Sequence, residues 1–413
     1  MAAKQESTAQ AAADVKFEFD KGDIDRWVGI PLAGSNMKEA VHVNDIRRWA
    51  QAMQNPNPLY FDEVYASKSR FGQIVAPQSF VVGTSDGGCG AMPAIQGHIP
   101  GSHGLFAGDE WWFHGPRVFP GDRIRQDRML HDYKIRETGF AGSSMITRGD
   151  TTYINDRGEI VAKQRATMVR YNIKEALKRD QYADDTMPEW TDEMLEKVER
   201  EITDWILSFR ALGHERRLDV SPGVVLPRRA TGPHTSLSML LEWTACPVMV
   251  WNSCRPEQAG FTSTEGSDWS GDAGWLPELS HDIEGAKIDP GRGDLVLRGP
   301  ARGHLMGGVA KKIGMPRGYG FGMTMGTWML DYVANWAGEW GEIVYSRSAY
   351  RAPTLEGDLA YIDGIVKDFS LDNPRGLGQP IATVEVTMTN QEQKILATAT
   401  VQVRLPTQTL PVA

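Results

Sequence analysis

The sequence has few cysteines, no long apolar run and no excess of basic residues, and each of these absences removes a class of protein. Its 3 cysteines include no Cys-x-x-Cys pair, so neither a disulfide framework nor a zinc site is expected. No apolar stretch approaches the roughly 18 residues that a membrane-spanning helix needs. The formal charge of -9 argues against nucleic acid as a partner. We therefore expect a soluble protein without metal, cofactor or membrane contact.

The first residues also lack the layout of a signal peptide, in which basic residues precede an apolar stretch. Residues 1–15 are small and polar instead, which is typical of a disordered tail and predicts a cytoplasmic protein. Gly87-Gly88-Cys89-Gly90 is not followed by Lys-Ser/Thr, so it does not predict a phosphate-binding loop.

A chain of 413 residues is too long for one ordinary core, so two domains joined by a connecting segment are expected. The sequence also repeats itself. Residues 155–170, a turn followed by a strand, return as residues 390–404, and Pro120-Gly121-Asp122 returns as Glu356-Gly357-Asp358. The helix expected around Trp49 is matched with a helix around Trp243. These two helices are closer together in the sequence than the other matched segments are. The second copy therefore carries additional residues, which we place near 251–299.

Each copy is expected to contain a helix, an irregular segment, a longer central helix and about four strands in hairpins. In the second copy, residues 323–336 have apolar side chains at helical spacing, which predicts a helix buried against a curved sheet. Between the copies, Thr191 precedes an apolar helical period within residues 185–212 and predicts a capped connecting helix. The expected boundaries are a first domain over 16–173, a helical linker over 174–213 and a second domain over 214–406.

The most informative motif is Asn55-Pro56-Asn57-Pro58-Leu59-Tyr60-Phe61-Asp62, followed by Tyr65-Ala66. It resembles the signature of the MaoC-like, or hydratase-2, family, which reads Gly-Asp-x-Asn-Pro-Leu/Ile-His-x-Asp. The Asn-Pro-Leu core and the trailing acid match, but the family's catalytic Asp falls on Asn55 and its catalytic His on Tyr60. Residues 104–116 and 219–235 also look like double-hotdog members of this family that have an N-terminal FAS1-like dehydratase domain.

The resemblance implies an α+β double hotdog, in which two curved antiparallel sheets are each wrapped round a central helix. It further implies a lyase that adds water to, or removes it from, an acyl-CoA or related substrate, as a homodimer or as a heterodimer with another hotdog protein. This reaction requires a base for the water, an acid for the alpha carbon and donors for the enolate oxygen. The family supplies them from the motif Asp and His and from backbone N–H groups at the start of the central helix.

The candidate catalytic residues in this sequence are Asn55, Tyr60, Asp62 and His304. Asn55 cannot act as a base, although its amide could orient a water molecule. Tyr60 would be a weak general acid, because an unperturbed tyrosine titrates near pH ~10. His304 stands about where the motif His belongs in the second copy, and a surface or core histidine is the alternative. Asp62 could reach that site only if the two halves share their clefts.

The candidate substrate-binding residues are Asn57, Arg302, Tyr319, Gly322 and Trp328. For Asn57 a purely structural turn is the favoured interpretation. Arg302, and with it Arg317, could bind coenzyme A phosphates, although a solvated charged face explains both equally well. The glycines from residue 320 to 326 could let a thioester carbonyl approach the helix, or could form a tight packing turn. Trp328 could line a cleft for a bulky acyl group, or could simply belong to the core.

Three functions remain open at this point. The leading hypothesis is a MaoC-like hydratase or dehydratase with an altered Asp/His pair. The second is a non-catalytic double hotdog that binds an acyl ligand or serves as the partner of an active hydratase. A thioesterase, which shares the hotdog fold but not the Asn-Pro-Leu segment, is the least favoured.

Overall fold

The protein is described by a computed structural model that covers residues 19–36, 40–84, 90–246 and 302–407. The tail expected over residues 1–15 and the insertion expected near 251–299 lie outside these ranges.

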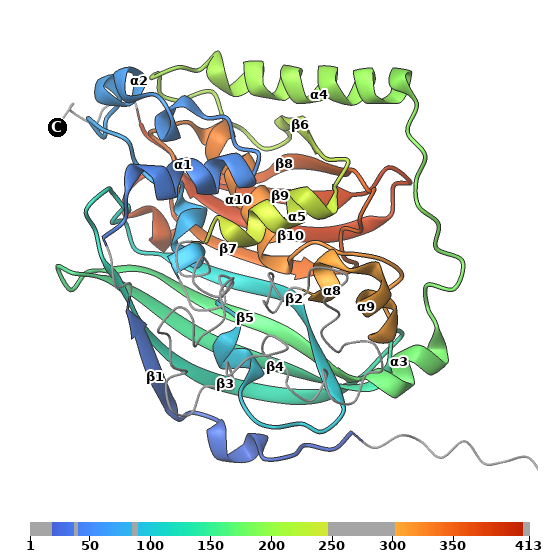
Figure 1. Cartoon of the computed structure of the whole chain (residues 1–413). Coiled ribbons are helices and arrows are strands. Elements are labelled where there is room, and N and C mark those ends of the chain that lie inside the picture. The colour runs from blue at the N-terminus through green and yellow to red at the C-terminus, as the bar shows by residue number, and fades with distance from the viewer. Residues whose placement is uncertain (1–18, 37–39, 85–89, 247–301, 408–413) are drawn as a thin grey trace, which may run out of the picture.

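One antiparallel sheet of ten strands runs through both halves of the chain (Figure 1). The first half contributes five neighbouring strands, in the order β1 (Pro31–Asn36), β3 (Ile124–Thr138), β4 (Gly142–Asn155), β5 (Ile160–Asn172) and β2 (Ser102–Phe113). The second half contributes β7 (Glu342–Tyr350), β10 (Ile395–Arg404), β9 (Ile381–Thr389), β8 (Ala360–Ser370) and β6 (Val225–Thr231). The second set repeats the connectivity of the first in reverse order, which confirms the repeat seen in the sequence.

The two halves meet where β2 pairs with β7. Glu110, Trp111 and Trp112 pair with Arg347, Ser346 and Tyr345 in antiparallel register. The buried carboxylate of Asp109 accepts hydrogen bonds from Trp111 at 2.7 Å and from Tyr350 at 3.3 Å, and it also pairs with Ser348 across the junction. The sheets of the two halves, which were expected to lie side by side and continue across the pair, therefore join into one sheet.

The central helix predicted for the second half is confirmed as α10 (Gly322–Ala337), and nearly all of its residues are buried. In the first half the corresponding described segment is a 3-10 helix, Gln78–Thr84, where a longer central helix was expected. Two neighbouring valines and a glycine are weak α-helix formers, which fits this difference. Gly83 also packs tightly, since a Cβ there would lie 2.6 Å from the ring of Trp49.

The remaining helices lie mostly on one side of the sheet (Figure 1). The first half contains α1 (Val43–Ala52), α2 (Glu63–Lys68) and α3 (Ile173–Arg179). The predicted connecting helix is α4 (Asp192–Arg210), which Thr191 caps and which packs on β6. The second half adds α5 (Ser236–Thr244), α8 (Arg302–Leu305) and α9 (Gly307–Lys312). Further 3-10 turns are Ile24–Trp27, Pro58–Tyr60, Met92–Ile95 and Pro374–Gly376.

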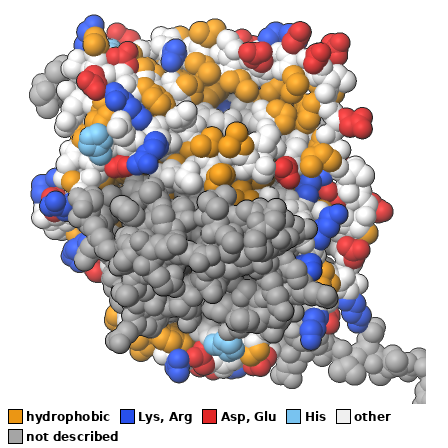
Figure 2. Space-filling view, in the orientation of Figure 1, with side chains coloured by type: hydrophobic (Ala, Val, Ile, Leu, Met, Phe, Trp, Pro, Cys, Tyr) orange, Lys and Arg blue, Asp and Glu red, His pale blue; other side chains and the backbone are white. Residues whose placement is uncertain are grey.

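Hydrophobic side chains gather on the outer surface above the grey region of Figure 2. Two of the exposed apolar residues are Leu237 and Leu241 on α5. Among the described helices, none is both long enough and apolar enough to cross a bilayer.

Candidate functional site

The motif of the first half lies at the interface with the second half. Asn55 and Asn57 are both buried. Asn57 Oδ1 accepts the N–H of Leu59 at 3.1 Å, and its Nδ2 donates to Asn335 Oδ1 at 2.8 Å. Asn335, which lies on α10, in turn donates to Asn55 Oδ1 at 2.9 Å. Both motif amides thus anchor the central helix of the other half.

Tyr60, at the position of the family's catalytic His, is also buried. Burial raises the pKa of its phenol above the ordinary value, the nearby Asp331 carboxyl raises it further, and Arg117 opposes both effects. Asp331, on α10, accepts the hydroxyl of Ser79 at 2.7 Å, and burial raises its pKa as well. A phenol that holds its proton this firmly is a poor acid at neutral pH.

Asp62 lies apart from this buried cluster. Its exposed carboxylate accepts the N–H groups of Val64 at 2.9 Å and of Tyr65 at 3.0 Å, and it thereby caps the N-terminus of α2. Such a cap contributes about 1 kcal/mol to stability. The contacts of Asp62 are those of a helix cap.

His304, on α8, has the geometry of a neutral base. Its Nδ1 lies 2.6 Å from the backbone oxygen of Tyr319. Because a carbonyl oxygen only accepts, Nδ1 carries the proton and the neutral ring keeps its lone pair on Nε2. Burial lowers the pKa of His304 to about 4, although the bond to Tyr319 acts in the other direction. At neutral pH the ring is therefore uncharged, and Nε2 can accept a proton.

The first turn of α10 borders His304. The imidazole stacks on the ring of Phe321, the residue before the helix, with centroids 4.0 Å apart. Among the described residues, no side chain caps this N-terminus, so the first N–H groups, at Gly322 and Met323, can attract an oxygen with partial negative charge. Gly322 also packs closely on the first half, since a Cβ there would lie 2.6 Å from the Cβ of Phe106.

Two of the predicted substrate-binding residues, Tyr319 and Trp328, are buried. The rings of Tyr319 and His304 lie 4.1 Å apart, and the Tyr319 hydroxyl is 3.5 Å from Nε2 of His103 on β2. Trp328 stacks on His234 at 4.8 Å, deeper along α10. Burial lowers the pKa of His103 to about 3 and that of His234 to about 4, so both rings are neutral.

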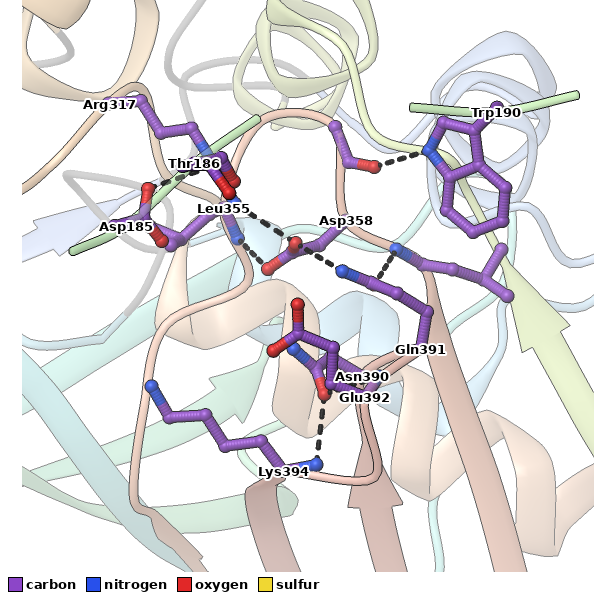
Figure 3. Close-up of polar contacts among 12 residues, drawn as sticks. Asp185, Thr186, Trp190, Arg317, Leu355, Asp358, Asn390, Gln391, Glu392 and Lys394 are labelled. Atoms are coloured by element: carbon purple, nitrogen blue, oxygen red, sulfur yellow. Dashed lines mark hydrogen bonds and ion pairs between the residues drawn. The ribbon is translucent and has the colours of Figure 1, made fainter. Parts of the chain in front are cut away.

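The two arginines considered for phosphate binding differ. Arg302 begins α8, and its side chain lies outside the described part of the protein. Arg317 is buried and donates to Asp185 at 2.8 Å and to Asp358 at 3.1 Å (Figure 3). Trp190 donates nearby to the backbone oxygen of Gly357 at 2.9 Å. Arg317 therefore fastens the connecting segment to the second half, and its ion pairs leave it unsuited to a phosphate.

Comparison with known proteins agrees with this fold. A family model described as the FAS1-like, dehydratase domain region matches residues 26–164. A solved MaoC-like dehydratase covers 93% of this chain with 100% of its own, at a TM-score of 0.57 and 18% identity. The chain has the fold of the MaoC-like hotdog proteins. A conserved hypothetical protein from Mycobacterium tuberculosis, described as a double hotdog, covers 92% of this chain with 97% of its own, at a TM-score of 0.51 and 11% identity.

A curated relative is a probable enoyl-CoA hydratase alpha subunit from Thermomonospora curvata. It is 27% identical over 172 residues, which are 38% of this chain and 54% of the relative. The match therefore spans about half of the relative's length.

One buried acid next to this site was missed in the sequence. Glu242, on α5, is 1% exposed, and Thr324 in the first turn of α10 donates to its Oε2 at 2.9 Å. Burial raises the pKa of Glu242 to about 8. Neither a motif nor a spacing marks this residue, because it lies outside the Asn-Pro-Leu segment and its counterpart. The separation of α5 from α10 in the chain conceals the contact.

Proposed function

We propose that this protein is a hydro-lyase that adds water to, or removes it from, an acyl-CoA or related thioester, and that its working site lies in the second half. The observation that carries this proposal is the position of His304, a neutral imidazole next to the uncapped N-terminus of α10. The coenzyme A thioester is proposed from the family and from the enoyl-CoA hydratase relative.

In the hydration direction, Nε2 of His304 takes a proton from the attacking water. The thioester carbonyl accepts hydrogen bonds from the backbone N–H groups of Gly322 and Met323, where the helix dipole stabilises the negative charge of the enolate. Tyr319 contributes by fixing the His304 tautomer through its backbone oxygen. Asn55, Asn57 and Tyr60 keep the first half in shape and hold α10, and they take no part in the chemistry.

The test is a steady-state assay of the purified chain with short, long and aromatic enoyl-CoAs. Turnover is measured as the loss of the enoyl thioester absorbance. His304→Ala should lower turnover by about 100-fold or more, the usual scale for a general acid or base. His114→Ala is the matched control, because His114 is an exposed residue just after β2. Equal turnover of the wild type and His304→Ala, with both folded, would remove His304 from the mechanism.

A second candidate function is a non-catalytic subunit that assembles with an active hotdog hydratase. It is favoured by the absence of the Asp and His residues from the first-half motif and by the description of the relative as an alpha subunit. Wild-type protein that binds an acyl-CoA, or forms a complex with such a hydratase, but turns over none of the three enoyl-CoAs would support it.

A further inference from the structure

Building on the proposed function, we propose that Glu242 is a second proton-transferring residue of the site around His304, and that it delivers a proton to the substrate carbon. The two halves of the chain differ at this position, and the first half shows what packing alone requires there.

The backbone contacts fix which residues are equivalent in the two halves. Val41 donates its N–H to the backbone oxygen of Asp122 at 2.8 Å, and His234 donates to that of Asp358 at 2.8 Å. Helices α1 and α5 then begin two residues after Val41 and His234. Counting along both helices places Glu242 at the position of Trp49. The sequence comparison had matched Trp49 with Trp243, and the structure corrects it by one residue.

Trp49 and Glu242 each make a hydrogen bond to the start of the helical segment at the centre of their own half. Trp49 Nε1 donates to the hydroxyl of Ser79 at 3.3 Å, whereas the hydroxyl of Thr324 donates to Glu242 at 2.9 Å. Both side chains are fully buried. The first half satisfies this position with a large apolar ring, so the fold itself does not require an acid there. Burying a carboxyl group also costs free energy that an apolar side chain would not.

Helix α5 carries this acid on its inner side together with the buried Met239, while two of its leucines face outward. Leu237 is 64% exposed and Leu241 is 48% exposed, whereas Glu242 is 1% exposed. Packing alone would favour another apolar side chain at position 242. The orientation of α5 instead directs a carboxyl group at the first turn of α10, next to the N–H groups proposed to bind the thioester oxygen.

The protonation state of Glu242 suits the delivery of a proton. Its pKa of about 8 results from burial, and the hydrogen bond from Thr324 opposes the shift. The helices around α5 carry other titratable residues, namely Asp45, Arg47 and Arg48 on α1, His304 on α8 and Asp331 on α10. Burial, not one of these charges, is the cause of the raised pKa. Glu242 is therefore a neutral acid at neutral pH.

The two residues complete a balanced reaction. His304 takes a proton from water while the water oxygen bonds to the beta carbon, and the electrons of the double bond move onto the enolate. The O–H bond of Glu242 then breaks as the C–H bond at the alpha carbon forms. The proton on His304 and the negative charge on Glu242 are removed by exchange with solvent. One water molecule is added, and both residues return to their starting state.

The decisive variant is Glu242→Gln, assayed with whichever of crotonyl-CoA, dodecenoyl-CoA and cinnamoyl-CoA the wild type hydrates fastest. We expect kcat to fall by about 100-fold or more. The wild-type rate should decline above pH ~8 as Glu242 loses its proton, and the residual rate of the variant should lack this decline. Glu242→Asp should restore part of the rate. Glu196→Gln, on the exposed face of α4, is the control and should behave as the wild type.

The outcomes separate this inference from the proposed function. If His304→Ala loses activity while Glu242→Gln keeps both its rate and its alkaline decline, then Glu242 is only structural and the inference alone fails. If Glu242→Gln loses activity only in proportion to its unfolded fraction in circular dichroism melting, the inference fails as well. A wild type that hydrates none of the three substrates contradicts both proposals.

Discussion

Replacing Asn55 with Asp restores the residue of the family signature, yet the structure predicts a loss of stability. Asn55 is buried near the carboxyl group of Asp331, and its Oδ1 accepts a hydrogen bond from Asn335 at 2.9 Å. An aspartate at position 55 would place a second carboxyl group in the same cluster. A buried polar group that is left without a partner costs about 1–3 kcal/mol, and more where the group is charged. We expect a loss of roughly 2–4 kcal/mol at neutral pH.

The sign of the pH dependence follows from the crowding of two carboxyl groups. The pKa of the new group in the folded protein lies above its unfolded value, so the folded state binds the extra proton. Stability is then lost as the pH rises through the folded pKa and is recovered in acid, where the group is protonated in both states. Urea unfolding at pH ~5 and pH ~7.5 should therefore show the larger deficit at the higher pH.

The matched control is the double variant Asn55→Asp with Asp331→Asn, which returns one carboxyl group and one amide to the cluster. It should recover most of the lost stability, and the coupling between the two sites gives the energy of the contact. In Asn55→Asp with Tyr60→His, activity per folded molecule should stay nearly unchanged. A wild-type stability for Asn55→Asp, or a severe loss or large gain of turnover in the second variant, would refute the view that this site is structural.

Three further changes test other parts of the structure. Tyr60→Phe should retain normal folding and most of its turnover in the enoyl-CoA assay; a large loss would give the phenol a chemical role. Arg317→Ala leaves the buried Asp358 without its cation and should cost about 3–5 kcal/mol in urea unfolding, while KM for the acyl-CoA stays constant; a raised KM with intact stability would restore the phosphate role. Gly322→Val should collide with Phe106 and lower kcat more than stability, and an unchanged kcat would show that the carbonyl does not bind there.

Much of the fold could be predicted because it is encoded locally. The apolar spacing of residues 323–336 and the capping Thr191 each specified a helix within a few residues of its observed ends. The repeat predicted the matching of β5 with β10, because both copies keep the same turn and alternation.

The site was less predictable, because its contacts join distant segments. Asn335 reaches Asn55 and Asn57 from α10, and nothing in the spacing of the motif indicates that partner. Glu242 was missed for the same reason, since burial and the contact with Thr324 exist only after α5 packs beside α10. Local patterns report helices and turns, whereas the ionisation of an acid depends on its surroundings in three dimensions.

The junction of β2 with β7 bears on how such a chain could arise and be divided. If the two halves were separated, β2 and β7 would each become an edge strand with unpaired backbone groups. Such an edge can pair with a strand of another molecule. Two separate polypeptides with these edges would find each other and rebuild the same ten-stranded sheet. The covalent link through α3 and α4 then chiefly guarantees one copy of each half per assembly. Because every assembly then contains both halves, one half can lose its catalytic residues as long as it continues to support its neighbour.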